Sequence, residues 1–310
     1  MPVDWHWLTY AYLTRVNPKC SLIMETELWP NYYEYFYYKG ITNIIVNARL
    51  SERTTKAPKF VQVWITHACQ FVSYILARSE EDAELYIALG AQPEYVKVIG
   101  NIKYAVKPPQ DITSTNLSHP YVLFASSRNG EEKLIVNTWL SLREPKPLLV
   151  IVPRHIQRLD DILSNLKGMS NKIAIRSRQE SVTEATEIYI ADTFGELTSF
   201  IHGSQFVIMG GSFMPFGGQN IIEVGQAGKA VIFGPHMENF KMEAEQFVQA
   251  DAAIQASNLD VLSTTVVDLL NKPERVKQLG ENGKGLVNQH EHIVEDYLSE
   301  IEKHCRPLNS

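Results

Sequence analysis

Short apolar runs of the kind that form buried strands alternate with helix-like segments along almost the whole chain. In the first third the expected strands are Cys20–Met24, Asn43–Val46, Tyr74–Ala77 and Val96–Ile99. Further along they are Tyr121–Ala125, Leu148–Val152, Lys172–Ile175, Glu187–Ala191, Phe206–Met209 and Ala230–Phe233. Strands that alternate with helices build a parallel sheet covered on both faces. We therefore predict an α/β fold made of Rossmann-like domains.

Helical segments fill the gaps between these strands. They are Tyr32–Tyr38, Lys59–Phe71, Glu80–Leu89, Glu131–Leu142, Gln157–Asn165 and Glu196–His202. The region from Lys241 to Lys303 is expected to be mostly helical, with breaks at Gly280 and Gly283.

A polar stretch over 107–120, with prolines and several hydroxyl residues, interrupts the alternation and is typical of a linker. We predict a first domain over 1–106, the linker over 107–120, a second domain over 121–290, and a C-terminal helix over 291–310 that could return to the first domain. The first domain is shorter than the roughly 150 residues usual for its type and opens without a strand. We therefore expect the chain to begin inside an incomplete first domain.

Composition excludes several classes of protein. The net charge of −6 and the pI near 5.9 argue against a nucleic-acid-binding surface. Cys20, Cys69 and Cys305 are too few and too scattered for a disulfide framework or a zinc site, and they favour a reduced, cytoplasmic setting. No stretch approaches the roughly 18 consecutive apolar residues of a membrane-spanning helix.

A glycine-rich loop follows the expected strand Phe206–Met209. Two glycine pairs, Gly210-Gly211 and Gly217-Gly218, bracket the loop, which leads into a helix expected to begin near Gln219. Glycines allow close approach to an anion, and free N–H groups at a helix start would then face that anion. This pattern favours an anionic, hydroxyl-rich ligand such as a nucleotide sugar. A helix N-terminus with two turns and no ligand is the alternative.

The segment Tyr32–Tyr38 is unusually rich in aromatic residues. Tyrosine suits a membrane interface, because it combines an apolar ring with a polar tip. We favour a helix that is half core and half domain contact.

Seven motifs in order resemble the 3-deoxy-manno-octulosonic acid (Kdo) transferases of lipopolysaccharide biosynthesis. They are Met24-Glu-Thr-Glu-Leu-Trp-Pro-Asn31, Asn47-Ala-Arg-Leu-Ser51, Gly100-Asn-Ile-Lys103, Val152-Pro-Arg-His155, Asp192-Thr-Phe-Gly-Glu-Leu197, the glycine loop with Asn220 and Glu223, and Gly234-Pro-His-Met-Glu-Asn-Phe240. The resemblance implies two Rossmann-like domains of the GT-B type with the active site between them. It also implies transfer of Kdo from CMP-Kdo, which is a substrate and not a cofactor, to a lipid A precursor.

The resemblance places the donor on the second domain. Arg154 could meet the phosphate or the Kdo carboxylate with a charge-assisted pair, and Glu223 would accept hydrogen bonds from the ribose. Many family members have His-Asn-Pro at 219–221; Gln219 keeps a hydrogen-bonding group there but cannot titrate. The other donor-side candidates are Ser127, Arg128, Pro153, His155, Thr193, Gly195, Glu196, Gly210, Gly211, Ser212, Gly217, Gly218 and Asn220. Alternatively, Arg154 lies solvated on a surface turn, and Asp192 or Thr193 only caps a helix.

Acceptor-side candidates lie in the first domain. Glu25 and Glu27 are two residues apart in an extended segment, so their side chains would point the same way and could bind acceptor hydroxyls. Two solvated glutamates are the alternative. The other candidates are Asn31, Asn47, Arg49 and Ser51. The resemblance implies a glutamate as general base in a loop that this chain does not contain, so its catalytic residue is unknown.

The resemblance further implies an inverting reaction without a metal ion, peripheral contact with the membrane, and a place on the cytoplasmic face of the inner membrane. Two alternatives remain open. One is a donor-binding fragment without catalytic activity. The other is a GT-B enzyme or epimerase that uses a uridine-diphosphate sugar, although such enzymes lack the segment Met24–Asn31.

Overall fold

The chain divides into two compact units, each with its own parallel sheet. The structure, a computed structural model, describes residues 4–25, 29–50, 54, 57–105, 115, 117–143 and 145–305. Unit 1 consists of Met1–Val106 and His290–Ser310, and unit 2 consists of Lys107–Gln289. Within these described residues, none of the helices is long and apolar enough to cross a membrane.

Unit 1 contains a four-stranded parallel sheet in the order β1-β2-β3-β4. Its strands are β1 (Cys20–Met24), β2 (Thr42–Ala48), β3 (Tyr74–Ala77) and β4 (Val96–Val98). Its helices are α1 (His6–Val16), α2 (Pro30–Tyr38), α4 (Lys59–Gln70), α5 (Glu80–Ala88) and α13 (Ile293–His304), with the 3₁₀ turns η1 (Pro93–Tyr95) and η2 (Ile102–Ala105).

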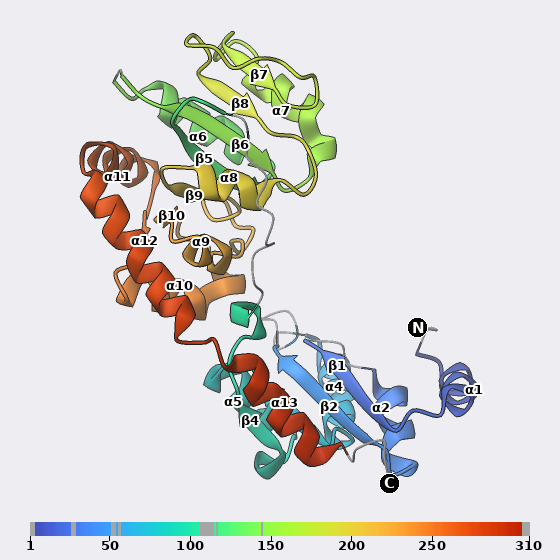
Figure 1. The fold of residues 1–310 in the computed structure, drawn as a ribbon. Helices are drawn as coiled ribbons and strands as arrows, with labels where there is room; N and C mark the ends of the chain where they lie inside the picture. Colours follow the sequence, from blue (N-terminus) through green and yellow to red (C-terminus); the bar gives the residue numbers. More distant parts are fainter. Residues whose placement is uncertain are drawn as a thin grey trace. The chain divides into compact units, whose positions relative to one another are not determined.

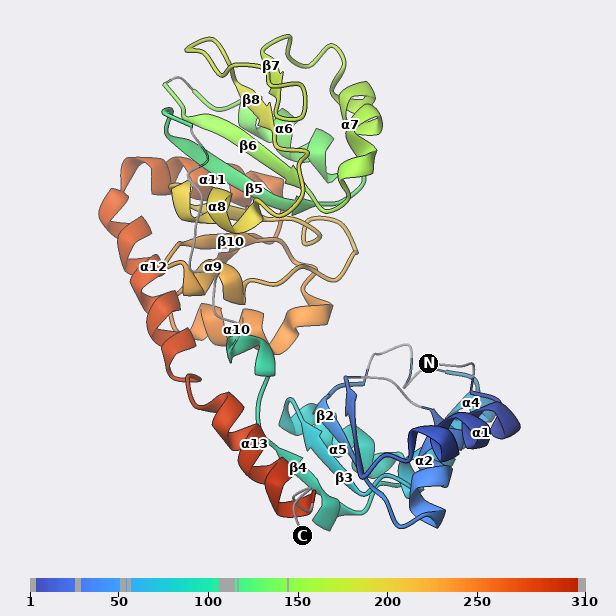
Figure 2. The ribbon, with the colours of Figure 1, turned by 45° about the vertical axis from the view of Figure 1, so that its right-hand side comes forward.

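Helices cover both faces of this sheet. One core joins Ile45 and Ile75 to buried side chains of α1, α2, α4 and α5. On the other face, Ile293 and Tyr297 of α13 pack against Ile44 of β2, and Figures 1 and 2 show this helix in red beside the sheet. The last described helix of the chain therefore completes the first unit.

The aromatic segment in α2 lies mainly in the core of unit 1. Tyr32, Tyr33 and Phe36 are buried, whereas Tyr37 and Tyr38 are exposed. The core part of the expectation for this helix agrees with the structure, and its contact with another domain stays a prediction.

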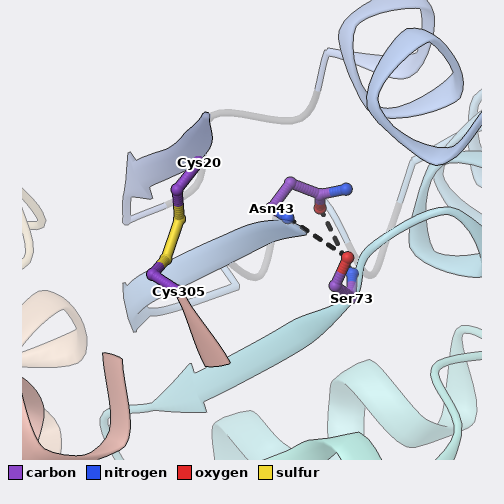
Figure 3. Close-up of a disulfide and its surroundings, with 4 residues drawn as sticks. All are labelled: Cys20, Asn43, Ser73 and Cys305. Atoms are coloured by element: carbon purple, nitrogen blue, oxygen red, sulfur yellow. Dashed lines mark hydrogen bonds between the residues drawn. A yellow bond between two sulfur atoms is a disulfide. The ribbon is translucent and has the colours of Figure 1, made fainter. Parts of the chain in front are cut away.

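A disulfide joins the start of β1 to the residue after α13 (Figure 3). It links Cys20 to Cys305, 285 positions apart, with 6.0 Å between their Cα atoms. We predicted reduced cysteines, and for this pair the prediction is wrong. A C-terminal helix that could return to the first domain was expected, but the sequence did not show that Cys305 would meet Cys20 at the start of β1. Nearby, Asn43 and Ser73 exchange hydrogen bonds and align the starts of β2 and β3.

Unit 2 contains a seven-stranded parallel sheet in the order β11-β10-β9-β5-β6-β8-β7. Its strands are β5 (Tyr121–Ser127), β6 (Leu148–Pro153), β7 (Ile173–Ile175), β8 (Ile188–Ile190), β9 (Val207–Met209), β10 (Val231–Phe233) and β11 (Ala253–Gln255). Its α-helices are α6 (Glu131–Leu140), α7 (Leu159–Leu166), α8 (Leu197–Gly203), α9 (Ile222–Gln226), α10 (Lys241–Gln249), α11 (Leu259–Asn271) and α12 (Pro273–Asn288). The 3₁₀ turns are η3 (Ile156–Arg158) and η4 (Glu238–Phe240).

Side chains that alternate along β5 divide the core of unit 2 into two faces. Val122 and Phe124 point into a cluster with α6, α7 and α11. Tyr121 points to the opposite face, where its hydroxyl donates to the Phe200 carbonyl of α8 at 2.8 Å. Helices on both faces explain why the strands are continuous apolar runs.

The predicted helix breaks at Gly280 and Gly283 are wrong. Both glycines lie inside α12, which continues to Asn288. Gly280 is needed for close packing, because a Cβ there would collide with the Gly228 backbone. A Cβ on Gly283 would make an ordinary contact with the Gly225 Cα at 3.4 Å. The helical region is broken elsewhere, by β11 and at Pro273.

Candidate functional site

The strand order of unit 2 reverses at β5, which lies between β6 and β9. The chain proceeds from β5 to β6 on one side and reaches β9 on the other. In open α/β sheets, ligands bind at such a switch point, outside the carboxyl ends of the strands. Every donor-side candidate predicted from the sequence lies at the carboxyl end of β5 or β6, in the loops that follow β5, β6, β8 and β9, or at the start of α9.

Close backbone contact joins β9 to β5 at this edge. Gly210 donates its N–H to the Ala125 carbonyl at 2.7 Å. A Cβ on Gly210 would lie 2.6 Å from the Ser126 carbonyl oxygen, so a larger residue would separate the two strand ends. The first glycine pair therefore brings the two loops of the switch point together.

The carboxylate of Glu131, at the start of α6, is completely buried and bridges these loops. Its Oε2 accepts from the N–H groups of Gly211 at 2.6 Å and Arg128 at 3.0 Å. Its Oε1 accepts from those of Phe213 at 3.0 Å and Met214 at 3.3 Å. Burial raises the pKa of this carboxyl group, and the four hydrogen bonds oppose that rise.

These contacts correct the expected role of the glycine loop. The Gly211 N–H already donates to Glu131, and the Gly218 N–H donates to the Gly211 carbonyl at 2.7 Å. Helix α9 begins at Ile222 rather than near Gln219 and has only five residues. The N–H groups of Gly210, Gly211 and Gly218 are therefore engaged within the protein and are not free to bind an anion.

The neighbouring Glu132, also completely buried, ties β5 to the loop after β6. Its carboxylate accepts from Ser127 Oγ at 2.8 Å and from both terminal nitrogens of Arg158, at 3.0 and 3.2 Å. The Arg154 N–H donates to the Ser127 carbonyl at 3.1 Å. Ser127, a predicted ligand contact, is thus buried and uses its hydroxyl inside the protein.

Cationic side chains gather on the exposed side of this scaffold. Arg128 Nη1 lies 2.9 Å from His155 Nε2, and the guanidinium carbon of Arg128 lies 5.1 Å from the centre of the Phe216 ring. Because a guanidinium only donates, His155 Nε2 is the acceptor in this contact. Arg154 is exposed beside the buried Pro153. Arg128, His155 and Phe216 come from three separate loops and form a surface suited to a flat or anionic ligand.

The turn after β8 is held by an ion pair. Arg176 contacts both carboxylate oxygens of Glu196 at 2.6 and 2.5 Å, and the Thr193 hydroxyl also donates to Glu196. The Arg176 guanidinium lowers the pKa of the Glu196 carboxyl. The Glu196 carboxylate thus fixes the turn after β8. Within this turn, Gly195 adopts a φ of 83°.

The suggested capping role of Asp192 or Thr193 is wrong, because the N-cap of α8 is Glu196 and no side chain caps the helix. Asp192 instead accepts from the N–H and hydroxyl of Ser177, at 2.9 and 2.5 Å. Phe194, at the tip of the turn, is 92% exposed. A polar cavity of about 660 Å³ is lined by Thr193 and Glu196 but by no other predicted donor-side residue.

At the end of the glycine loop, Asn220 orients Glu223. Asn220 Nδ2 donates to Glu223 Oε1 at 3.0 Å, and Asn220 Oδ1 accepts from the Ile222 N–H at 3.1 Å. Gln219 packs beside Gly211. Ser212 is buried and structural: its hydroxyl donates to the Met209 carbonyl at 2.6 Å and accepts from the Gly234 N–H at 2.8 Å. The Asn239 N–H donates to the Gly217 carbonyl at 2.9 Å and anchors the second glycine pair.

Three of the described acceptor-side candidates of unit 1 bond to other residues of the unit. Glu25, after β1, forms an ion pair with Lys103 at 3.0 Å. Asn47 is buried and accepts from the Ile102 N–H at 3.1 Å, and Asn31 donates to the Asp4 carbonyl at 2.9 Å. Arg49 is half-buried after β2. The predicted residues Glu27 and Ser51 lie outside the described residues.

Several residues that organise the site were missed in the sequence: Glu131, Glu132, Arg158, Arg176 and Phe216. The adjacent glutamates at the start of a helix could be read as favourable charges at its N-terminus. The sequence did not show that these two carboxylates are buried. A buried carboxylate requires several hydrogen-bond partners, whereas an exposed one is solvated by water.

Comparison with known proteins gives one consistent result. A family model described as 3-deoxy-D-manno-octulosonic-acid transferase matches residues 1–106. The 3-deoxy-D-manno-octulosonic acid transferase of Haemophilus influenzae is 30% identical over 91% of this chain and 69% of that protein. The Bordetella pertussis protein of the same name is 28% identical over 97% of this chain and 73% of that protein.

Solved structures agree with the fold. The C-terminal CMP-Kdo binding domain of WaaA from Acinetobacter baumannii is 27% identical, with a TM-score of 0.51 over 54% of this chain and 89% of that domain. The Anabaena protein Alr3699/HepE, solved with UDP, is 15% identical, with a TM-score of 0.64 over 94% of this chain and 80% of that protein. The second similarity shows the fold alone.

Proposed function

The chain belongs to the 3-deoxy-D-manno-octulosonic acid (Kdo) transferases, glycosyltransferases of the GT-B fold, and we propose that it transfers Kdo from CMP-Kdo to a lipid A precursor. The observation that carries the donor assignment is the group of Arg128, Arg154 and His155 at the switch point of unit 2. The similarity of the chain to a CMP-Kdo binding domain supports the same assignment.

In this proposal the donor meets side chains rather than the N–H groups of the glycine loop. CMP-Kdo carries a phosphate and a carboxylate, and guanidinium groups bind both with charge-assisted hydrogen bonds. Arg128 and Arg154 directly follow β5 and β6 at the switch point, so we assign the two anionic groups to them. Glu223, oriented by Asn220, accepts from the ribose hydroxyls. The Thr193–Glu196 turn receives the cytosine through its backbone.

On the acceptor side we propose an inverting, metal-independent transfer. Inversion requires a carboxylate to remove the proton of the acceptor hydroxyl. We assign that base to none of the described residues. Glu25, the described glutamate among the acceptor-side candidates, forms an ion pair with Lys103. Glu25 and Arg49 are proposed to border the acceptor.

We also propose peripheral contact with the cytoplasmic face of the inner membrane, through unit 1. Exposed aromatic side chains on helices α1 and α4 support it: Trp7 is 65% exposed and Trp64 is 55% exposed. Aromatic side chains with a polar edge suit the interface between membrane and water.

Calorimetric titration with CMP and with UMP tests the donor assignment. The wild-type chain is expected to bind CMP more tightly than UMP. Loss of a hydrogen bond to a charged group costs about 1.5–3 kcal/mol, so Arg154→Ala and Glu223→Ala are each expected to weaken CMP binding roughly 10- to 100-fold. Arg143→Ala, which removes an exposed arginine beyond α6, is the control and should bind like wild type.

Tighter binding of UMP would replace the proposal with a uridine-sugar enzyme. A folded wild-type chain that bound neither nucleotide would contradict a donor site in unit 2. If Arg154→Ala bound CMP as tightly as wild type, Arg154 would not be part of the site. The preference for CMP over UMP would then be judged from the two wild-type titrations.

A further inference from the structure

We propose that Glu131 is a positioning residue of the donor site, whose buried carboxylate fixes the glycine loop after β9 to the loop after β5. The part of this inference that concerns the donor rests on the function proposed above. The part that concerns the two loops rests on the geometry of unit 2 alone.

The contacts of Glu131 are those of an anion in a ring of backbone donors. Four N–H groups reach its carboxylate, two on each oxygen, at distances of 2.6 to 3.3 Å. Three of these donors belong to the segment Gly211–Met214, and the fourth belongs to Arg128. Glu131 itself has no exposed surface. Burial in a medium of low dielectric strengthens these bonds and makes the loss of one costly.

The two fixed loops present the exposed groups that would meet the donor. The Arg128 N–H bonds to Glu131, and the side chain of the same residue reaches His155 at 2.9 Å. Phe216, two residues beyond Met214, lies under the Arg128 guanidinium at 5.1 Å. If the loops separated, Arg128 and Phe216 would part. Glu131 therefore acts on the ligand through other residues and touches no solvent or ligand itself.

Chemistry requires a carboxylate at this position. A glutamine offers one acceptor oxygen and one NH₂ group, and that NH₂ group would face two backbone N–H donors that cannot accept a hydrogen bond. Glu131→Gln therefore loses at least half of the bridge while it keeps nearly the same volume. Glutamate thus supplies a fixed internal anion for backbone N–H groups of the two loops.

Hydrogen–deuterium exchange tests the structural part. In the wild-type protein the amides of Gly211, Phe213 and Met214 are expected to exchange slowly although they lie in a loop, and in Glu131→Gln about tenfold or more faster. The control is Glu243→Gln, another completely buried glutamate of unit 2, on α10. It should leave exchange over 209–216 unchanged. Fast exchange of these amides in the wild-type protein would overturn the inference even if Glu131→Gln failed to fold.

Binding and kinetics test the functional part. Glu131→Gln is expected to bind CMP roughly tenfold more weakly and to show a raised KM for CMP-Kdo, with a smaller change in kcat. Glu243→Gln should match wild type in both. Faster loop exchange with unchanged CMP affinity would overturn the positioning role. A wild-type chain that bound no CMP would overturn the proposed function and the positioning role together, while exchange would still decide whether Glu131 fixes the loops.

Discussion

Replacement of Arg158 with alanine is expected to destabilise unit 2 by about 3–5 kcal/mol, because it leaves a buried carboxylate without its counter-ion. Glu132 has no exposed surface, and the Arg158 side chain is 15% exposed. After the substitution, the Ser127 hydroxyl still donates to that carboxylate. One neutral hydrogen bond cannot offset the desolvation of a charge.

The free energy of unfolding of unit 2 can be measured from its slowest-exchanging amides, in β5 and β6. The control is Arg275→Ala: Arg275 pairs with Asp251 at 2.5 Å, but both side chains are substantially exposed, at 33% and 49%. Exposed pairs contribute about 0–1 kcal/mol, so the two arginine variants should differ clearly.

A double variant separates an unpaired charge from lost packing. Glu132→Leu with Arg158→Leu removes both charges and is expected to restore most of the stability lost in Arg158→Ala. A loss below about 1 kcal/mol in Arg158→Ala would show that solvent reaches Glu132 and that the pair is not buried in solution.

The adjacent glutamates also explain how one edge of a sheet becomes a binding surface. Glu131 joins the loops after β5 and β9, and Glu132 joins the end of β5 to the loop after β6. Arg128, Arg154 and His155 extend from the loops so joined. Buried acidic residues therefore hold exposed basic residues in place, and an anionic donor meets the basic layer.

The sequence predicted the sheets well because most of the parallel strands are buried on both faces and form apolar runs, although the edge strand β1 exposes Leu22 and Met24. The bounds expected for Cys20–Met24 and Tyr74–Ala77 agree with β1 and β3. Strand β11, which is only Ala253–Gln255, was missed because three residues with an exposed glutamine form no apolar run. Helix α1 was missed too; its apolar residues are mostly exposed, and no side chain caps its start.

The candidate site was predictable in its loops but not in its internal bonds. Motifs in order placed Arg154, Glu223 and the glycine loop at one edge of a sheet. They could not show that the Gly211 N–H meets a glutamate 80 residues away. Long-range partners of this kind follow from the folded topology, as does the pairing of Cys20 with Cys305.

Gly280→Ala is expected to destabilise unit 2 by about 1–3 kcal/mol, although alanine is the better helix former. Gly280 lies in the middle of α12 and is buried against α9 and the turn that follows it. An added Cβ would collide with the carbonyl oxygen of Gly228. Because that atom belongs to the backbone, it cannot rotate away as a side chain would, and α12 would have to shift from its partner.

Gly285, on the same helix, provides the matched control. A Cβ there would have no neighbouring atom within 4 Å. Gly285→Ala is therefore expected to stabilise unit 2 by about 0.5–1 kcal/mol, through the higher helix propensity of alanine. Thermal unfolding of both variants should thus move in opposite directions from wild type. If both variants gained stability, Gly280 would have no packing role, and close contact between α12 and α9 would not explain why glycine stands inside this helix.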